Sequence, residues 1–489
     1  MKQFLFIILC PALMFSQTQI GDNINGTAAD DQFGSSVSLS SDGSIMAIGA
    51  PYNNGNGSNS GQVQIYENIG GIWTQIGDDI NGEYAEDFSG WSVSLSSNGN
   101  IVAIGAHKNN RSGAYSGHVR VYENISGVWT QIGEDIDGEA YRDESGYNIS
   151  LSSDGSIVAI GAPNNDGNGS DSGHVRVYEN ISDVWTQVGD DINGAAAGDV
   201  FGWSVSLSSN GNIVAIGSPR NSDNGNRSGH VRVYENVSDA WTQIGSDIGG
   251  ESELDESGID VSLSSDGSII AIGAHKNSGN GYRSGHVRVY ENISGVWTQI
   301  GSDIDGENVE DQSGRNVSLS SDGNIVAIGA IYNDGSGSES GHVRIYKNLA
   351  NAWVQIGNDI DAELNFSWLG FSVSLRSDGS IVGVGASRID GGNGNNSGQV
   401  RIYDLSTVLL SDSFVLEAFD IYPNPTQHAI RINLKDEYLL KKVNLYNYLG
   451  SFIKSTTKST LDVSKESSGI YLLEVVTDKG KATKKIVVE

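Results

Sequence analysis

The chain has 489 residues and a formal net charge of −31, from 60 acidic and 29 basic side chains. The acidity is confined to residues 17–418, which hold 52 acidic and 17 basic side chains, whereas residues 419–489 hold 8 and 11. Nucleic-acid binding requires clustered Lys and Arg, so the acidic region excludes a nucleic-acid partner. The change in charge divides the chain into two regions of different composition.

The first 16 residues have the pattern of a cleaved signal peptide. Lys2 precedes an apolar run, residues 4–15, that is too short to span a bilayer. We expect cleavage near Ser16. The only cysteine, Cys10, follows Leu9 inside this run, which disfavours a lipoprotein signal. The mature chain would then have no disulfide, no thiolate nucleophile, no cysteine metal site and no transmembrane segment.

A unit of 56 residues occurs seven times in the acidic region. The central residue of its V-S-L segment falls at Val37, Val93, Ile149, Val205, Val261, Val317 and Val373. A period of this size is typical of solenoids and propellers.

Each copy has the pattern of four short strands. In the first copy, residues 35–40 and 62–66 alternate polar and apolar side chains, and residues 45–50 are mostly apolar. Ser41-Asp42-Gly43 forms a tight turn, and residues 73–76 give the fourth strand. Short strands at even spacing, separated by turn residues, predict an all-β fold.

The two ends of the repeat region predict that the array is closed. The seventh copy ends after Tyr403 without a W-T-Q-I-G strand. The predicted mature chain begins with Q-T-Q-I-G at residues 17–21, which aligns with the W-T-Q-I-G strand 56 residues later. Completing the last sheet with the first strand removes an exposed sheet edge. We therefore predict a seven-bladed β-propeller over residues 17–404. The small residues of the first two strands should line its axis, and Tyr and Trp should fill the wider gaps outside.

The repeat resembles a known family. Phe33-Gly34, Gly49-Ala50-Pro51 and the following G-Q-V-Q-I-Y are similar to the FG-GAP repeat of integrin α-subunit propellers, and Phe201-Gly202 with Gly217-Ser218-Pro219 is a second close copy. The resemblance implies a propeller and is compatible with adhesion. Some members carry a calcium loop between the first two strands. The S-S-D-G turns of this chain are too short to wrap a cation, so that site is not expected here.

The remaining residues predict a linker and a second domain. Residues 405–418 are the expected linker, and residues 419–489 alternate strands and turns in the pattern of a small β-sandwich. This region also resembles the type A C-terminal sorting domain of the type IX secretion system of Bacteroidota. The motif residues are Tyr422, Pro423, Asn424, Pro425, Gly450, Gly469, Tyr471, Gly480 and Lys481. The resemblance implies export through a type IX translocon, usually with removal of this domain, to the cell surface or the medium.

Histidine recurs at one strand position in five copies, with arginine two residues later. The histidines are His118, His174, His230, His286 and His342, and the first and last copies hold Gln62 and Gln399. Equivalent positions of neighbouring blades lie on the order of 10 Å apart in a seven-fold ring. Zinc requires nitrogen at about 2 Å. We therefore predict an inter-blade packing and hydrogen-bonding position and not a metal site.

Acidic turns such as residues 78–83 and 134–139 follow the fourth strand in nearly every copy. A catalytic carboxylate pair occurs at a single site, whereas these turns recur in nearly every copy. We therefore expect them to be solvated turns and not catalytic groups. Residues 166–171 and 334–339 resemble the start of a calcium loop, but they lack the sixth-position Gly and the distal Glu. We expect no cofactor, with calcium as the alternative.

The copies differ at the position after the motif glycine, where the inner strand begins on the face with the longer loops. This position holds Ser35, Trp91, Tyr147, Trp203, Ile259, Arg315 and Phe371. Large aromatic side chains beside a polar rim could bind sugar or protein, or could plug the mouth of the channel. The candidate ligand-binding residues are Trp91, Tyr147, Trp203, Arg315 and Phe371.

No hydrolase, zinc-protease, P-loop or cysteine-nucleophile motif occurs in the sequence. We therefore expect a non-enzymatic, monomeric binding or adhesion module for a glycan or protein. Two alternatives are a secreted polysaccharide hydrolase or lyase that uses carboxylates on the long-loop face, and a structural surface component with no discrete ligand.

Overall fold

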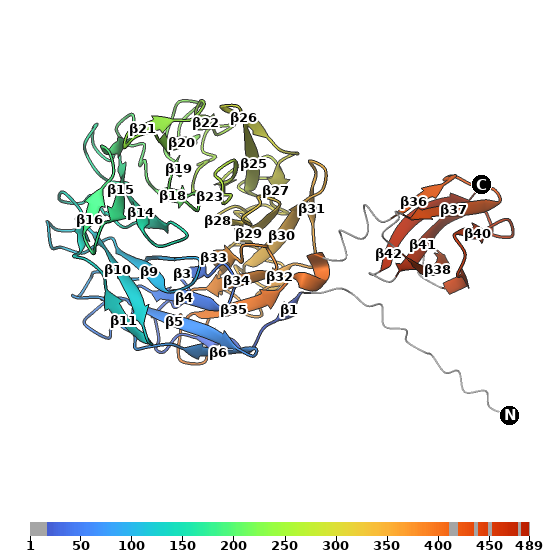
Figure 1. Ribbon diagram of the computed structural model, residues 1–489, viewed down its shortest axis with the longest axis horizontal. Coiled ribbons are helices and arrows are strands. Elements are labelled where there is room, and N and C mark those ends of the chain that lie inside the picture. Colours follow the sequence, from blue (N-terminus) through green and yellow to red (C-terminus); the bar gives the residue numbers. More distant parts are fainter. Residues whose placement is uncertain (1–16, 410–418, 435–438, 448–451, 478–480, 489) are drawn as a thin grey trace. The chain divides into compact units, whose positions relative to one another are not determined.

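The computed structural model describes residues 17–409, 419–434, 439–447, 452–477 and 481–488. The chain separates into two compact units, Thr18–Asp404 and a unit that includes Leu405–Glu489 (Figure 1). This division coincides with the predicted end of the repeats. The predicted signal peptide, residues 1–16, lies outside the described residues. So does most of the predicted linker, although its residues 406–409 form a helical turn. No helix among the described residues is long and apolar enough to cross a membrane.

The first complete repeat forms one antiparallel sheet. Its strands are β3 (Ser36–Leu39), β4 (Ile45–Ala50), β5 (Gln62–Ile69), β6 (Ile72–Gln75) and β7 (Ile80–Asn81). The spatial order is β3-β4-β5-β6, and β7 also pairs with β5. The four predicted strands are present, and β5 extends three residues beyond the predicted end.

The fifth strand, β7, was not predicted. It pairs Ile80 with Val63 and Asn81 with Gln62, whereas β6 pairs with the other half of β5. Gly77 turns the chain between β6 and β7 with a φ of +74°, a conformation that favours glycine. The two short strands share one edge of β5, and the buried side chain of Ile80 joins the core.

Five further repeats have the same sheet. Their strands are β8 (Ser92–Leu95), β9 (Ile101–Ala106), β10 (His118–Ile125), β11 (Val128–Gln131), β12 (Ile136–Asp137), β13 (Asn148–Leu151), β14 (Ile157–Ala162), β15 (His174–Asn180), β16 (Trp185–Gln187), β17 (Ile192–Asn193), β18 (Ser204–Leu207), β19 (Ile213–Ser218), β20 (His230–Asn236), β21 (Trp241–Gln243), β22 (Ile248–Gly249), β23 (Asp260–Leu263), β24 (Ile269–Ala274), β25 (His286–Ile293), β26 (Val296–Gln299), β27 (Ile304–Asp305), β28 (Asn316–Leu319), β29 (Ile325–Ala330), β30 (His342–Asn348), β31 (Trp353–Gln355) and β32 (Ile360–Asp361). Figure 1 shows the sheets arranged around a central axis, with β3, β18, β23, β28 and β33 innermost.

The seventh sheet is built from both ends of the repeat region. Strands β33 (Leu369–Leu375), β34 (Ile381–Ala386) and β35 (Gln399–Asp404) come from the last repeat, and β1 (Thr18–Gln19) and β2 (Ile24–Asn25) come from the N-terminal segment. Thr18 pairs with Asp404, and Ile24 pairs with Val400. The predicted closing strand is therefore present, and the structure adds β2 beside it. The fold is a β-propeller with seven sheets as blades.

A ring of hydrogen bonds around the axis confirms the closure. A serine hydroxyl in each inner strand accepts a bond of 2.9–3.0 Å from a leucine backbone N–H of the next blade. The ring runs through Ser38, Ser94, Ser150, Ser206, Ser262, Ser318 and Ser374. The last serine bonds to Leu39 of the first repeat, so the ring has no gap. The small, polar side chains at the axis therefore join neighbouring blades.

The outer strands are joined by tryptophan. Trp129 Nε1 donates a 3.0 Å bond to the carbonyl of Ile76 in the preceding blade, and four later copies repeat this contact. Trp73 makes the same bond to Ile20, at 3.2 Å, so the N-terminal segment takes the place of a preceding blade. The prediction that Trp fills the outer gaps is confirmed.

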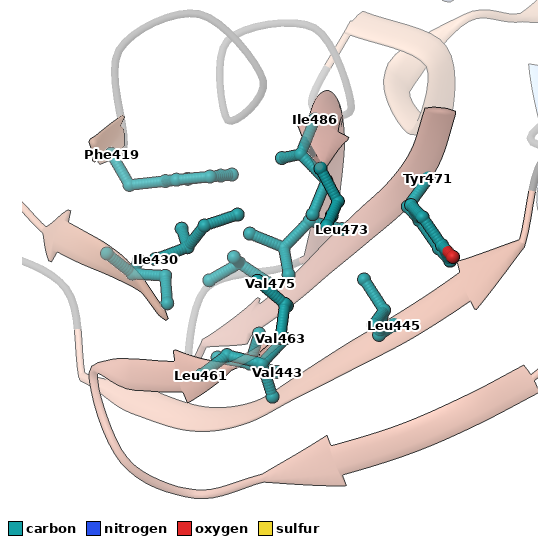
Figure 2. Packing of buried hydrophobic residues seen from close by; sticks show 12 residues of the cluster. Phe419, Ile430, Val443, Leu445, Leu461, Val463, Tyr471, Leu473, Val475 and Ile486 are labelled. Carbon is teal, nitrogen blue, oxygen red and sulfur yellow. The ribbon is translucent and has the colours of Figure 1, made fainter. Parts of the chain in front are cut away.

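The C-terminal unit is the predicted β-sandwich. One sheet has the order β36 (Phe419–Tyr422), β37 (Ala429–Leu434), β40 (Thr460–Asp462). The other has the order β39 (Phe452–Thr456), β38 (Leu440–Asn447), β41 (Gly469–Thr477), β42 (Lys481–Val488). Phe419, Ile430, Leu445 and Leu473 are among the residues of the core between them (Figure 2).

Candidate functional site

The starts of the seven inner strands surround one cavity of about 240 Å³ on the propeller axis. We call it the mouth cavity. It is lined by Ser35, Trp91, Tyr147, Trp203, Ile259, Arg315 and Phe371, together with the first residues of the strands that follow them. The structure therefore brings together all five of the predicted ligand-binding residues. Their part in ligand binding remains a prediction.

Three aromatic side chains pack against one another along one wall of the mouth cavity. The ring centroids of Trp91 and Tyr147 are 5.7 Å apart, and those of Tyr147 and Trp203 are 4.7 Å apart, in tilted geometry. All three are half-buried. Phe371 lies parallel to Trp368, at 6.1 Å. The aromatic rings therefore occupy part of the channel mouth, and an open cavity remains beside them.

The floor of the mouth cavity is polar. Asn148 and Asn316 accept hydrogen bonds of 3.0 and 2.7 Å from the backbone N–H of the next blade. Ser92 and Ser204 occupy the same strand position and instead donate to a carbonyl of the next blade, both at 2.9 Å. The amide and hydroxyl groups that face the cavity are therefore held in fixed orientations by contacts between blades.

Asp260 is the acidic member of this floor. Its Oδ2 accepts a 2.8 Å hydrogen bond from the Val317 N–H. Burial raises the pKa of Asp260 to about 7, although backbone hydrogen bonds and the charge of Arg315 act in the opposite direction. At neutral pH this carboxyl is therefore partly protonated.

The sequence analysis did not predict that His107 packs against the aromatic wall. His107 contacts both Trp91 and Tyr147, with centroid distances of 4.5 and 5.5 Å. Burial, with a contribution from Lys108, lowers the pKa of His107 to about 3, so the imidazole is neutral. The position holds Pro in the copies with Pro51, Pro163 and Pro219. This variation was the available signal, but the fold was needed to place it beside the aromatic wall.

The recurring histidines lie elsewhere, at the junctions between blades. Each has two carboxylates beside it, as in the group Glu83, His118 and Asp135. The histidine Nδ1 lies 3.5–3.8 Å from the aspartate Oδ2 in all five copies. The sequence argument against a metal compared only histidines of neighbouring blades and missed these carboxylates.

The donor set of these junctions could hold a divalent cation, because imidazole and carboxylate groups both bind metals such as zinc and manganese. However, a guanidinium competes for the glutamate in four copies. Arg120 Nη1 lies 3.8 Å from Glu83, and the equivalent arginines of three other copies lie at 3.5 Å. The junction already contains a positive charge that balances one of its carboxylates.

The two calcium-like loops use their carboxylates locally. Asp166 Oδ1 accepts a 2.8 Å bond from the Asp171 N–H, and Asp334 Oδ1 accepts a 2.7 Å bond from the Glu339 N–H. Among the described residues, the clusters able to hold a metal do not include these loops. The acidic turn after the fourth strand also makes local hydrogen bonds, because the Asp79 carboxylate accepts bonds from the side chains of Gln62 and Gln75.

The described sorting-motif residues lie both on the surface and in the core of the C-terminal sandwich. Tyr422, Pro423, Asn424 and Pro425 form an exposed turn, in which Asn424 Oδ1 accepts a 2.8 Å bond from the Val487 N–H in β42. Tyr471 is buried in the core, as Figure 2 shows, and its hydroxyl donates a 2.8 Å bond to the Ser467 carbonyl. Gly469 and Lys481 begin β41 and β42. Gly450 and Gly480 lie outside the described residues.

Residues 420–489 match the family model described as the secretion system C-terminal sorting domain. The C-terminal unit is a type IX sorting domain. The sorting domain directs the chain to secretion or to the outer-membrane surface, and it implies interaction with the secretion machinery. Residues 25–66 and 193–234 match the FG-GAP repeat, so the propeller contains repeats of this family. Comparison with curated proteins gives no match.

Solved propeller-like structures are similar to this chain. One is a putative 6-phosphogluconolactonase from Bacteroides uniformis, with 13% identity, a TM-score of 0.47, and coverage of 68% of this chain and 86% of the other. Another is the periplasmic gluconolactonase PpgL of Pseudomonas aeruginosa, with 15% identity, a TM-score of 0.46 and the same coverage.

Proposed function

We propose that the propeller is a non-enzymatic glycan-binding module that takes its ligand in the mouth cavity. The observation that carries the proposal is the aromatic wall of Trp91, Tyr147 and Trp203 beside a polar floor. The C–H faces of a sugar ring stack on aromatic side chains, and its hydroxyls bond to oriented amide and hydroxyl groups. The sorting domain supplies the setting, because the exported propeller meets extracellular polymers.

The size of the mouth cavity limits how much of a glycan it receives. Its volume of about 240 Å³ is below the roughly 300–1,000 Å³ typical of small-molecule pockets. We therefore expect it to hold a single sugar unit or the end of a chain, with the rest of the polymer lying over the rim.

A glycan array with the chain from Gln17 onward tests the proposal. Replacing two rings in Trp91→Ala/Trp203→Ala should weaken binding about tenfold or more, equivalent to at least about 1.4 kcal/mol. Val296→Ala is the control, because Val296 is 62% exposed at the β25–β26 turn, away from the cavity. Unchanged binding by the double variant would contradict the proposal. Selective binding of a protein through the same residues would replace the glycan with a protein ligand.

One observation favours the enzymatic alternative. Asp260 lines the mouth cavity, and its pKa of about 7 is suited to a general acid at neutral pH. Release of sugar products from a polysaccharide panel, lost in Asp260→Asn, would support a hydrolase or lyase. A polysaccharide that binds without being cleaved would support the binding module.

A further inference from the structure

Arginine in this propeller usually has a carboxylate partner, as expected when 52 acidic side chains surround 17 basic ones. Nine of the fourteen arginines lie within ion-pair distance of an aspartate or glutamate. They are Arg111, Arg120, Arg176, Arg232, Arg283, Arg288, Arg344, Arg376 and Arg401. An arginine without such a partner is therefore the exception in this domain.

Arg315 is the exception inside the mouth cavity. It lines the cavity and is half-buried, and among the described residues its guanidinium has no ion pair or hydrogen bond. The six equivalent positions hold no charge. A guanidinium partly removed from water, with no carboxylate within ion-pair distance, is unfavourable by itself, so it favours an anion supplied from outside.

Two further unpaired arginines lie around the aromatic residues of the mouth. The Arg220 guanidinium lies 5.6 Å from the ring centroid of Trp203, and that of Arg388 lies 3.5 Å from the ring centroid of Trp368, which stacks on Phe371. Neither has an ion-pair partner in the part of the chain that the structure describes. Both side chains are exposed, and each guanidinium lies over an aromatic ring: Trp203 lines the cavity, and Trp368 stacks on the lining residue Phe371.

The acidic groups of the mouth do not cancel these charges. The buried Glu256 is paired with Lys276, at 2.8 Å. The Asp260 carboxyl accepts a backbone hydrogen bond and is not within ion-pair distance of Arg315. Burial also holds its pKa at about 7, so its negative charge is partial at neutral pH. Neither carboxylate is within ion-pair distance of Arg315, Arg220 or Arg388 among the described residues, so these three guanidinium groups remain available to an anionic ligand.

We propose that the ligand of the mouth cavity is an anionic polysaccharide, whose carboxylate or sulfate group is bound by Arg315 with Arg220 at the rim. This inference rests on the proposed glycan-binding function. The planar guanidinium matches the paired oxygens of either group, while the sugar ring stacks on the aromatic wall. The acidic surface elsewhere repels a polyanion, so binding concentrates at the mouth.

Titration calorimetry of the chain from Gln17 onward with three probes tests this inference. The probes are oligogalacturonate, dextran sulfate and neutral dextran. We expect binding of at least one anionic probe in preference to dextran, and at least tenfold weaker binding of that probe by Arg315→Gln. Arg227→Gln is the matched control, because Arg227 is an exposed, unpaired arginine on a loop. Its affinity should equal that of the parent chain.

The outcomes separate this inference from the function on which it rests. Preference for oligogalacturonate identifies the anion as a carboxylate, and preference for dextran sulfate identifies it as a sulfate. Binding of dextran that is lost in Trp91→Ala/Trp203→Ala but unchanged in Arg315→Gln keeps the glycan-binding function and overturns the anionic ligand. Equal loss in Arg315→Gln and Arg227→Gln also overturns it. Failure of every probe and of the glycan array overturns both.

Discussion

Gly383 and Gly385 are two residues apart in β34, but they differ in how much space a side chain would have. A Cβ on Gly385 would lie 2.1 Å from the carbonyl oxygen of Gly34 in the neighbouring blade. A Cβ on Gly383 would meet Met46 Sδ at 3.2 Å, which a flexible side chain can accommodate, and the other six copies hold Ala at this position. The first glycine is required by the close approach of two blades, and the second is not.

We therefore expect Gly385→Ala to lower the free energy of unfolding by about 1–3 kcal/mol, as overpacking does. Gly383→Ala should be neutral or should stabilise by up to about 1 kcal/mol, because alanine restricts the unfolded chain. Thermal or urea unfolding followed by circular dichroism measures both. Equal destabilisation by the two substitutions would contradict this account of the blade contact.

At the scale of elements, the N-terminal segment closes the propeller. Besides the β1–β35 pairing, the Ile20 N–H donates a 2.8 Å bond to the Ile402 carbonyl, and the Ile20 carbonyl accepts the Trp73 indole N–H. Ile24, Phe33 and Val400 share one hydrophobic cluster across the seam. The seam therefore has the same kinds of contact as the other blade junctions.

Deleting residues 17–21, with the signal peptide kept, should lower the melting temperature by several degrees and promote aggregation, because the edge of β35 becomes exposed. Trp73→Phe is a milder companion variant that removes the indole bond to Ile20 and part of the ring packed against the seam cluster, and it should lower the melting temperature less. Differential scanning calorimetry with light scattering measures both effects. A melting curve unchanged by the deletion would argue against closure by β1.

At the scale of the whole molecule, seven buried histidines link stability to pH. They are His107, His118, His174, His230, His275, His286 and His342. Burial lowers the pKa of all seven, to about 3 for His107 and to about 4 for His118, His174, His286 and His342. The unfolded chain, with histidine pKa values of about 6.5, binds these protons first.

The stability of the propeller should therefore be fully present above pH 6.5 and should fall as the pH drops toward 4. Each histidine contributes up to about 1.4 kcal/mol per pH unit in this window. Burial also raises the pKa of ten carboxyl groups among the described residues, including Asp260, and these shifts act in the opposite direction. Apart from Asp260, their ordinary pKa values lie near 4, so the histidines dominate the upper part of the window. Melting temperatures from pH 7.5 to 4.5 measure the effect. His286→Gln, which introduces the residue found at Gln62 and Gln399, should fold and show a shallower decline. A flat profile would contradict the prediction.

The repeat made the architecture predictable. Aligning seven copies shows which residues are equivalent, so it predicts the blades, the closing strand and the set of side chains at the mouth. It does not give distances between non-equivalent positions. The pairing of Ile80 with Val63, the carboxylates beside His118 and the contact of Arg220 with Trp203 depend on how one turn folds back or how two blades meet. These features needed the three-dimensional structure.

A crystal structure of the exported protein bound to oligogalacturonate or a sulfated oligosaccharide tests the central claim most directly. The account predicts one sugar unit in the mouth cavity, with its ring against Trp91, Tyr147 or Trp203 and its anionic group within hydrogen-bonding distance of Arg315. An occupied site at the blade junctions or on the sorting domain, with an empty mouth cavity, would contradict it.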